Sequence, residues 1–266
     1  MYRKHYGFRR LPFDRDIPAK DLFPNAGLDE LHSRLTYLVQ TRGVGVVTGE
    51  PGSGKTTALR RLRAGLHPDQ VRPLYVFDTA VNTADLYRQI AAELGIEAQW
   101  SRAMTLRAIQ EEIGRLVKER KLTVLLVLDE AHRLRPDVMA ELPLLTNFEW
   151  DSANRLALLL SGQTALRTVL RRAVLEALNQ RITVRYNLDG FDRETTEHYI
   201  EHRLRTAGVD RALFSKPAIE AIYNATGGVM RSIDAIAHHA LTAASSARDK
   251  IVDIDHVRAA TQENRP

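Results

Sequence analysis

The stretch Gly49-Glu50-Pro51-Gly52-Ser53-Gly54-Lys55-Thr56 decides the fold of this chain. It matches the pattern G-x-x-x-x-G-K-[ST], in which the backbone N–H groups of a glycine-rich loop close around phosphates at the start of a helix. The apolar, β-branched segment from Val44 to Thr48 precedes it and predicts a buried strand. Leu59, Leu62 and Leu66 follow it at helical spacing. A strand, a glycine loop and a helix in this order predict a site for nucleotide phosphates.

Each polar residue of this loop has an expected role. Lys55 would reach the β- and γ-phosphates, and the Thr56 hydroxyl would bind Mg²⁺. The alternative is an ordinary glycine-rich turn before a helix, which the flanking strand and helix disfavour. The residues expected to contact the nucleotide are Gly49, Glu50, Pro51, Gly52, Ser53, Gly54, Lys55, Thr56 and Thr57.

A second motif lies at the end of another apolar segment. Residues 122–128, Leu-Thr-Val-Leu-Leu-Val-Leu, form the kind of run found in central parallel strands, and Asp129 and Glu130 follow directly. Asp129 can hold the hydration shell of Mg²⁺ at the carboxyl end of the strand, and Glu130 can polarise the attacking water as a general base. A strand that ends in a solvated acidic turn is the alternative. The two motifs together predict that the chain binds ATP or GTP and hydrolyses it.

Composition excludes several other chemistries. The chain has 266 residues, is 44% hydrophobic and has no cysteine, so disulfides, thiolate metal sites and cysteine nucleophiles are excluded. No run has the roughly 20 apolar residues of a transmembrane helix, and the basic start lacks the apolar stretch of a signal peptide. We therefore expect no membrane association and a cytoplasmic location. The net charge of +5 permits binding to nucleic-acid phosphates but does not require it.

The order of the remaining elements predicts an α/β fold with a doubly wound parallel sheet. Further strands are expected at residues 74–78, 155–162 and 182–186. They alternate with helices that apolar spacing predicts at residues 29–40, 83–94, 105–118 and 137–148, the last of them interrupted at Pro143. In such a sheet, ligands bind at the carboxyl edge of the strands.

Three regions follow from this pattern. Residues 1–30 contain Pro12, Pro18 and Pro24 and predict an irregular lead-in segment. Residues 31–190 would form the α/β nucleotide-binding domain. Residues 191–266 would form a small all-helical domain, with helices at residues 194–205, 216–225, 231–247 and 254–262.

Polar residues at other element ends can complete the site. Ser161 and Gln163 end the strand expected beside the acidic one, and Gln163 is the better candidate for sensing the γ-phosphate because its amide both donates and accepts. Arg181 can reach a neighbouring subunit's nucleotide as a trans-acting arginine finger. Arg171 and Arg172 are rivals for this role.

Of two further polar residues, we expect one to have a functional role and the other to have none. Arg231 stands in the first turn of a helix, where a cation is disfavoured by the helix dipole, so we expect it to report the nucleotide state. His132 is expected to be a packing or surface residue. No His, Asp or Glu cluster has the spacing of a transition-metal site, so Mg²⁺ is the expected metal, with Thr56 and Asp129 as its ligands.

Taken in order, the motifs resemble those of AAA+ ATPases of the ExeA-like group, which is similar to transposon ATPases of the TnsC, TniB and MuB type. They are the glycine loop, Leu-Asp-Glu-Ala-His, Ser-Gly-Gln, Gln-Arg-Ile and Gly-Gly-x-x-Arg. The segment from Tyr6 to Phe13 is similar to that group's N-terminal segment near the adenine, and the segment from Tyr199 to Gly208 resembles the start of its helical lid. The resemblance covers nearly the whole chain.

The resemblance implies ATP rather than GTP, and assembly of subunits into rings or filaments with shared sites. It implies that Lys55, Thr56, Asp129 and Glu130 act within one subunit, that Arg181 acts in trans, and that Arg231 is the lid sensor. ExeA-type secretion proteins are longer, and this departure disfavours a secretion role.

Three functions are compatible with this family. The first is a transposition regulator that oligomerises on duplex DNA with ATP, recruits a transposase and disassembles on hydrolysis. The second is a nucleotide-switched adaptor of a secretion or envelope complex, and the third is a replication initiator or loader. Candidate DNA contacts are the Trp100-Ser101-Arg102 loop and the loop from Thr79 to Thr83. Arg60, Arg61 and Arg63 are expected to form a solvated helix face.

Overall fold

The computed structural model describes residues 2–14, 16–148 and 153–263. The chain forms two compact units. The α/β unit consists of Gly27–Gly49 and Lys55–Leu188, and the helical unit consists of Met1–Ala26, Glu50–Gly54 and Asp189–Pro266. The lead-in segment is therefore part of the helical unit.

The α/β unit has a five-stranded sheet of order β2-β3-β4-β1-β5, and every strand pair is parallel. The central strands are buried along almost their whole length, whereas the outer strands alternate between buried and exposed residues. Hydrophobic runs thus take the middle of the sheet. The strands are β1 Val44–Gly49, β2 Val71–Val76, β3 Thr123–Leu128, β4 Leu156–Gly162 and β5 Ile182–Leu188.

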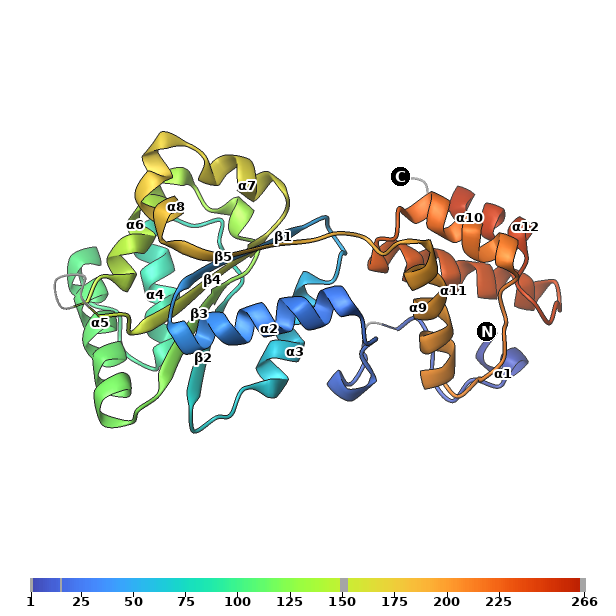
Figure 1. Cartoon of the computed structure of the whole chain (residues 1–266), viewed down its shortest axis with the longest axis horizontal. Helices are drawn as coiled ribbons and strands as arrows, with labels where there is room; N and C mark the ends of the chain where they lie inside the picture. Colours follow the sequence, from blue (N-terminus) through green and yellow to red (C-terminus); the bar gives the residue numbers. More distant parts are fainter. Residues whose placement is uncertain (1, 15, 149–152, 264–266) are drawn as a thin grey trace. The chain divides into compact units, whose positions relative to one another are not determined.

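Helices cover both faces of this sheet (Figure 1). α2 packs on β1, where the Leu38 side chain meets the backbone at Gly45. The opposite face shares one hydrophobic core with the helices between β2 and β5. The helices of this unit are α2 Ala26–Thr41, α3 Lys55–Gly65, α4 Thr83–Leu94, α5 Arg102–Glu119, α6 Pro136–Thr146, α7 Ala165–Leu170 and α8 Glu176–Arg181, with 3₁₀ turns at Ala131–Arg133 and Ala173–Leu175.

The helical unit contains α1 Tyr2–Tyr6, a 3₁₀ turn at Ala19–Asp21, α9 Arg193–Thr206, α10 Lys216–Thr226, α11 Met230–Ser246 and α12 Ile254–Glu263. The lead-in is tied to these helices by tyrosine hydroxyls. Tyr2 forms a 2.9 Å hydrogen bond with His238 Nδ1, and Tyr6 donates to the Asp249 carbonyl at 3.0 Å. These contacts order a segment that the sequence predicted to be irregular.

Three expectations about elements were wrong. The lead-in forms the short helix α1, because Tyr2 and Tyr6 are four residues apart and are both buried. α6 is continuous through Pro143, because a proline removes one backbone hydrogen bond while Leu142 and Leu145 stay buried on either side of it. β2 begins three residues earlier than expected and contains Pro73, which an edge strand tolerates.

A buried arginine joins the lead-in to α9. Arg203 is 3% exposed, and its guanidinium donates to the Pro12 carbonyl at 2.6 Å and to the Asp14 carbonyl at 2.7 Å. It also donates to the Tyr199 hydroxyl at 2.9 Å and lies 3.5 Å from the Asp234 carboxylate. Since a buried cation needs such partners, Arg203 and the lead-in depend on each other.

We predict that Arg203→Ala lowers the free energy of unfolding by about 3–5 kcal/mol, because it removes a buried cation, leaves the partly buried Asp234 carboxylate without its partner and releases the lead-in. Arg205→Ala on the same helix is the matched control. Arg205 pairs with Asp210 at an exposed site, so its loss should cost less than about 1 kcal/mol. Urea denaturation of both variants measures the difference, and equal costs would contradict this role of Arg203.

Burial raises the pKa of Asp234 to about 6, although Arg203 and the Tyr199 hydroxyl act in the opposite direction. Because this pKa is higher in the folded than in the unfolded state, the group's contribution to stability is present at low pH and is lost as pH rises through 6. We predict about 1 kcal/mol more stability from this group at pH 5 than at pH 7. Denaturation of the wild type and of Asp234→Asn at both pH values measures this difference. The free energy of unfolding should fall by more in the wild type than in the variant between pH 5 and pH 7, and equal changes would refute the role of Asp234.

Candidate nucleotide-binding site

The glycine loop connects the end of β1 to the start of α3. Its turn is closed by a 3.0 Å hydrogen bond from Ser53 N to the Glu50 carbonyl, and Lys55 Nζ donates to the Gly49 carbonyl at 2.8 Å. Lys55 is 6% exposed, which is unusual for a lysine. The loop therefore holds its cation at the position where the sequence predicted contact with phosphates.

Two hydroxyl groups of this segment suit a nucleotide with Mg²⁺. Ser53 is buried, and its Oγ has no hydrogen-bond partner among the residues that the structure describes. A buried donor without a partner indicates a missing acceptor, and a phosphate oxygen would supply one. Thr56 is exposed at the first turn of α3, so its hydroxyl is accessible to a cation. These residues fit the expected ligand.

Asp129 is a buried carboxylate that accepts three hydrogen bonds. It is 4% exposed and follows β3 directly. Its Oδ1 accepts hydrogen bonds from Ser161 Oγ at 2.8 Å and from Glu130 N at 3.0 Å. Its Oδ2 accepts one from the Tyr75 hydroxyl at 2.7 Å. Donors that follow or belong to β2, β3 and β4 thus fix the orientation of the acid expected to hold Mg²⁺.

Glu130 has a different environment from its neighbour. Its backbone has φ +50° and ψ +33°, the left-handed region that a non-glycine residue seldom adopts. The Thr79 hydroxyl donates to its carbonyl at 2.8 Å, and its side chain is 44% exposed. Because almost half of the Glu130 side chain is exposed, its carboxylate can contact a water molecule.

The sequence did not identify the contact of His132 with the end of β4. Gln163 N donates to His132 Nδ1 at 3.3 Å, so this ring nitrogen acts as an acceptor. Nδ1 also lies 3.6 Å from a Glu130 carboxylate oxygen. Ser161, the alternative to Gln163 as a sensor of the γ-phosphate, contacts Asp129 instead. His132 thereby links the backbone of Gln163 to the acidic turn.

The arginine candidates make other contacts. Arg181 ends α8, is half-buried and donates to Thr146 Oγ1 at 3.2 Å, whereas Arg171 and Arg172 are exposed. In the helical unit, Arg231 N donates to the Gly52 carbonyl at 3.2 Å. The trans role of Arg181 and the sensing role of Arg231 stay predictions.

Two expected DNA contacts differ in their surroundings. Trp100 is 86% exposed, whereas Arg102 pairs with Glu141 at 2.6 Å. Thr79 is buried by its contact with Glu130, so its side chain is not available to a nucleic acid. The exposed Trp100 ring thus keeps the accessibility that such a contact requires.

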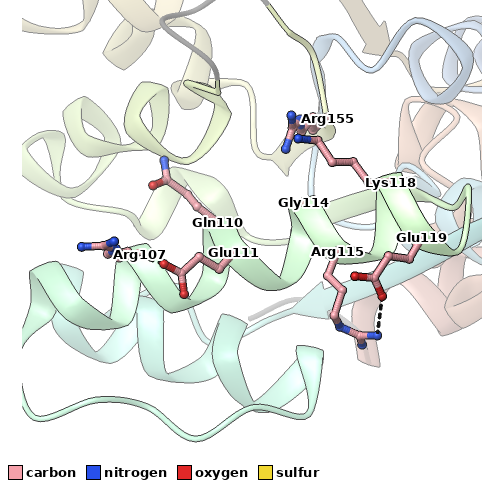
Figure 2. Close-up of a pocket in the computed structure, with 8 residues that line it drawn as sticks. All are labelled: Arg107, Gln110, Glu111, Gly114, Arg115, Lys118, Glu119 and Arg155. Atoms are coloured by element: carbon pink, nitrogen blue, oxygen red, sulfur yellow. Dashed lines mark hydrogen bonds and ion pairs between the residues drawn. The ribbon is translucent and has the colours of Figure 1, made fainter.

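Two surface grooves lie outside the cluster. Figure 2 shows one of about 500 Å³ along α5, where Arg107 pairs with Glu111 and Arg115 lies 3.7 Å from Glu119. It is lined by four basic and two acidic side chains, and both acids lie within 4 Å of an arginine. The other, of about 440 Å³, lies between β5 and α7 and contains Arg167, Arg171 and Arg185.

Two other features are absent from the described part of the chain. None of its helices is long and apolar enough to cross a membrane. It also contains no group of three or more His, Cys, Asp or Glu side chains placed to hold a metal ion together.

The fold and this site together define a P-loop nucleotide-binding protein of the AAA+ type. A family model described as an AAA domain matches residues 38–170, half of the chain, and the chain belongs to that family. The general secretion pathway protein A of Aeromonas hydrophila is 33% identical over 247 residues. That alignment covers 92% of this chain but 45% of the relative, so the chain spans less than half of the relative's length.

Solved structures share the fold at lower identity. Cdc6p from Pyrobaculum aerophilum has a TM-score of 0.74 and 21% identity, over 95% of this chain and 70% of that one. The Aeropyrum pernix ORC1 protein, solved in complex with DNA, has a TM-score of 0.68 and 20% identity, over 96% and 69% of the two chains. These similarities confirm the AAA+ fold expected from the motifs.

We predict that Gly52→Ala weakens ATP binding at least about tenfold, a loss of about 1.4 kcal/mol. Gly52 has φ +88°, and an added Cβ would lie 2.6 Å from Arg231 Cβ, so the loop would have to shift. Gly95→Ala is the matched control, because Gly95 has φ +80° but no atom within 4 Å of an added Cβ. Equilibrium binding of a fluorescent ATP analogue should separate the two variants, and equal affinities would argue against a tight loop.

Proposed function

We propose that this chain is an ATP-hydrolysing AAA+ switch. The observation that carries this proposal is the buried Asp129 carboxylate, fixed by three donors, with the half-exposed Glu130 directly after it. A rigid acid suits a hydrated metal ion, and an accessible acid suits activation of water. The glycine loop with buried Lys55 supplies the phosphate site.

Each residue has a role in this mechanism. Lys55 and the loop N–H groups bind the phosphates, and Thr56 and Asp129 hold Mg²⁺, which when bound neutralises charge on the β- and γ-phosphates. Glu130 orients the attacking water and accepts its proton. Gln163 contacts the γ-phosphate, Arg181 reaches the nucleotide of a neighbouring subunit, and Arg231 reports the nucleotide state.

We propose duplex DNA as the surface on which the ATP-bound form assembles, with a transposase as the protein it recruits and hydrolysis as the disassembly step. The net charge is +5, and Arg167, Arg171 and Arg185 border one groove. Guanidinium groups gathered in this way can neutralise phosphates without reading the base sequence. The transposase rests on the motif resemblance alone, and we place this activity in the cytoplasm.

The second candidate is a nucleotide-switched ATPase of a secretion complex. The specific observation in its favour is the 33% identity to the Aeromonas general secretion pathway protein A over 92% of this chain. Under this alternative the same ATP cycle would act on a protein partner, and duplex DNA would change neither hydrolysis nor assembly.

We predict that duplex DNA raises the ATPase rate of the wild type at low salt. We also predict that ATP increases the mass of the protein assembly that forms on DNA. Lys55→Ala should abolish both effects, because the phosphates lose their buried cation. The measurements are phosphate release and light scattering, with and without DNA. Hydrolysis that is insensitive to DNA would exclude the DNA-dependent candidate and favour a protein partner, and no hydrolysis under any condition would exclude the switch itself.

The groove arginines give a sharper test of the DNA contact. Arg171→Glu should weaken DNA binding about tenfold and leave ATP binding unchanged, because it reverses a charge in the proposed phosphate-binding groove. Arg107→Glu is the matched control, since Arg107 is also an exposed arginine of the α/β unit but already pairs with Glu111. Fluorescence anisotropy of labelled duplex DNA at two salt concentrations compares them, and equal losses would mean that the groove is not the contact.

A further inference from the structure

Tyr75 occupies an unusual position for a tyrosine. It lies on the edge strand β2, and its side chain is 41% exposed, yet its hydroxyl reaches the buried Asp129 carboxylate at 2.7 Å. The two residues are 54 positions apart in the chain. An exposed edge-strand tyrosine needs no such partner, because water would satisfy its hydroxyl. The contact therefore serves the carboxylate rather than the tyrosine.

Counting lone pairs shows what the hydroxyl does for Asp129. Each carboxylate oxygen offers about two acceptor sites. Oδ1 accepts from Ser161 and from the Glu130 backbone, so both of its sites are used. Oδ2 accepts one hydrogen bond, from Tyr75, among the described residues, which leaves one acceptor site on that oxygen. Three donors fix the plane of the carboxylate, and one lone pair stays available.

The backbone of β2 holds Tyr75 in place for this contact. Tyr75 pairs with Val127 in the register between β2 and β3, and Asp129 N donates to the Val76 carbonyl at 2.9 Å. The Tyr75 N–H donates to a Glu93 carboxylate oxygen at 3.1 Å. The ring of Phe77 stacks on that of Tyr75, with centroids 6.5 Å apart and planes 27° apart. Strand pairing and Glu93 thus hold the backbone of Tyr75, and Phe77 contacts its ring, which together position the hydroxyl.

We propose that Tyr75 is a positioning residue of the Mg²⁺ site. Its hydroxyl fixes Asp129 so that the remaining lone pair of Oδ2 accepts from the hydration shell of the cation. The inference rests on the proposed ATP-hydrolysing function and adds a residue to it.

A purely structural role makes a different prediction. If Tyr75 merely satisfied a buried carboxylate, its loss would lower the melting temperature and leave the Mg²⁺ requirement unchanged. A positioning role changes the dependence on Mg²⁺, because outer-shell partners of metal ligands typically contribute 10- to 100-fold to metal affinity.

The test is Tyr75→Phe, which removes the hydroxyl and keeps the ring that stacks on Phe77. Tyr37→Phe is the matched control, since Tyr37 is 57% exposed on α2 of the same unit. The readout is equilibrium binding of a fluorescent ATP analogue, in EDTA and across a Mg²⁺ titration, so it needs no hydrolysis. We expect Tyr75→Phe to raise the Mg²⁺ concentration at half-saturation roughly tenfold. Its affinity in EDTA should stay within about twofold of the wild type.

Ser161→Ala should show the same signature, because it frees the other oxygen of the same carboxylate. If Tyr75→Phe has the Mg²⁺ dependence of Tyr37→Phe, or needs less Mg²⁺ than the wild type, the positioning role is wrong. If the wild type itself binds the analogue without any dependence on Mg²⁺ and does not hydrolyse ATP, the proposed function fails, whatever the variants do. The two failures are therefore distinguishable.

Discussion

The α/β unit depends on the need to satisfy one buried negative charge. A carboxylate taken out of water is costly unless donors replace its hydration, and Asp129 is 4% exposed. Its three donors come from Tyr75, Ser161 and the following backbone N–H. This arrangement exists only when β2, β3 and β4 lie side by side in the observed register. The same hydrogen bonds thus specify the order of these strands and the direction of the acid.

Parallel strands bring these side chains together, because the carboxyl ends of parallel strands meet at one edge of the sheet. β1 pairs with β4, so the strand that carries the glycine loop lies next to the strand that ends at Ser161 and Gln163. Residues from three distant parts of the sequence then reach one edge without any long loop. The central strands are hydrophobic almost throughout, and their functional groups are confined to the ends.

Local sequence patterns predicted most of the helices and strands. The contacts between these elements depend on long-range strand pairing, which such patterns do not reveal. Apolar spacing predicted α4 at residues 83–94. The structure has the same bounds, with Asn82 capping the start and Gly95 in the left-handed conformation at the end. Proline chemistry misled at Pro143, where packing maintained the helix. The contact of Tyr75 with Asp129 could not be predicted, because it depends on the register of two strands separated by two helices. For the same reason the role of His132 was missed.

Adjacent carboxylates with different environments can divide the work of hydrolysis between them. Asp129 is buried, and its orientation is fixed by three donors. Glu130 is 44% exposed, and its backbone adopts the left-handed conformation at φ +50°. A non-glycine residue keeps such a conformation when its surroundings require it, and the Thr79 hydroxyl on the Glu130 carbonyl is one such restraint. An extended backbone at Glu130 would continue β3 and place the two acids on opposite faces of the sheet. The turn instead keeps both acids at the edge where the strands end, one rigid enough for a metal ion and the other free to meet water.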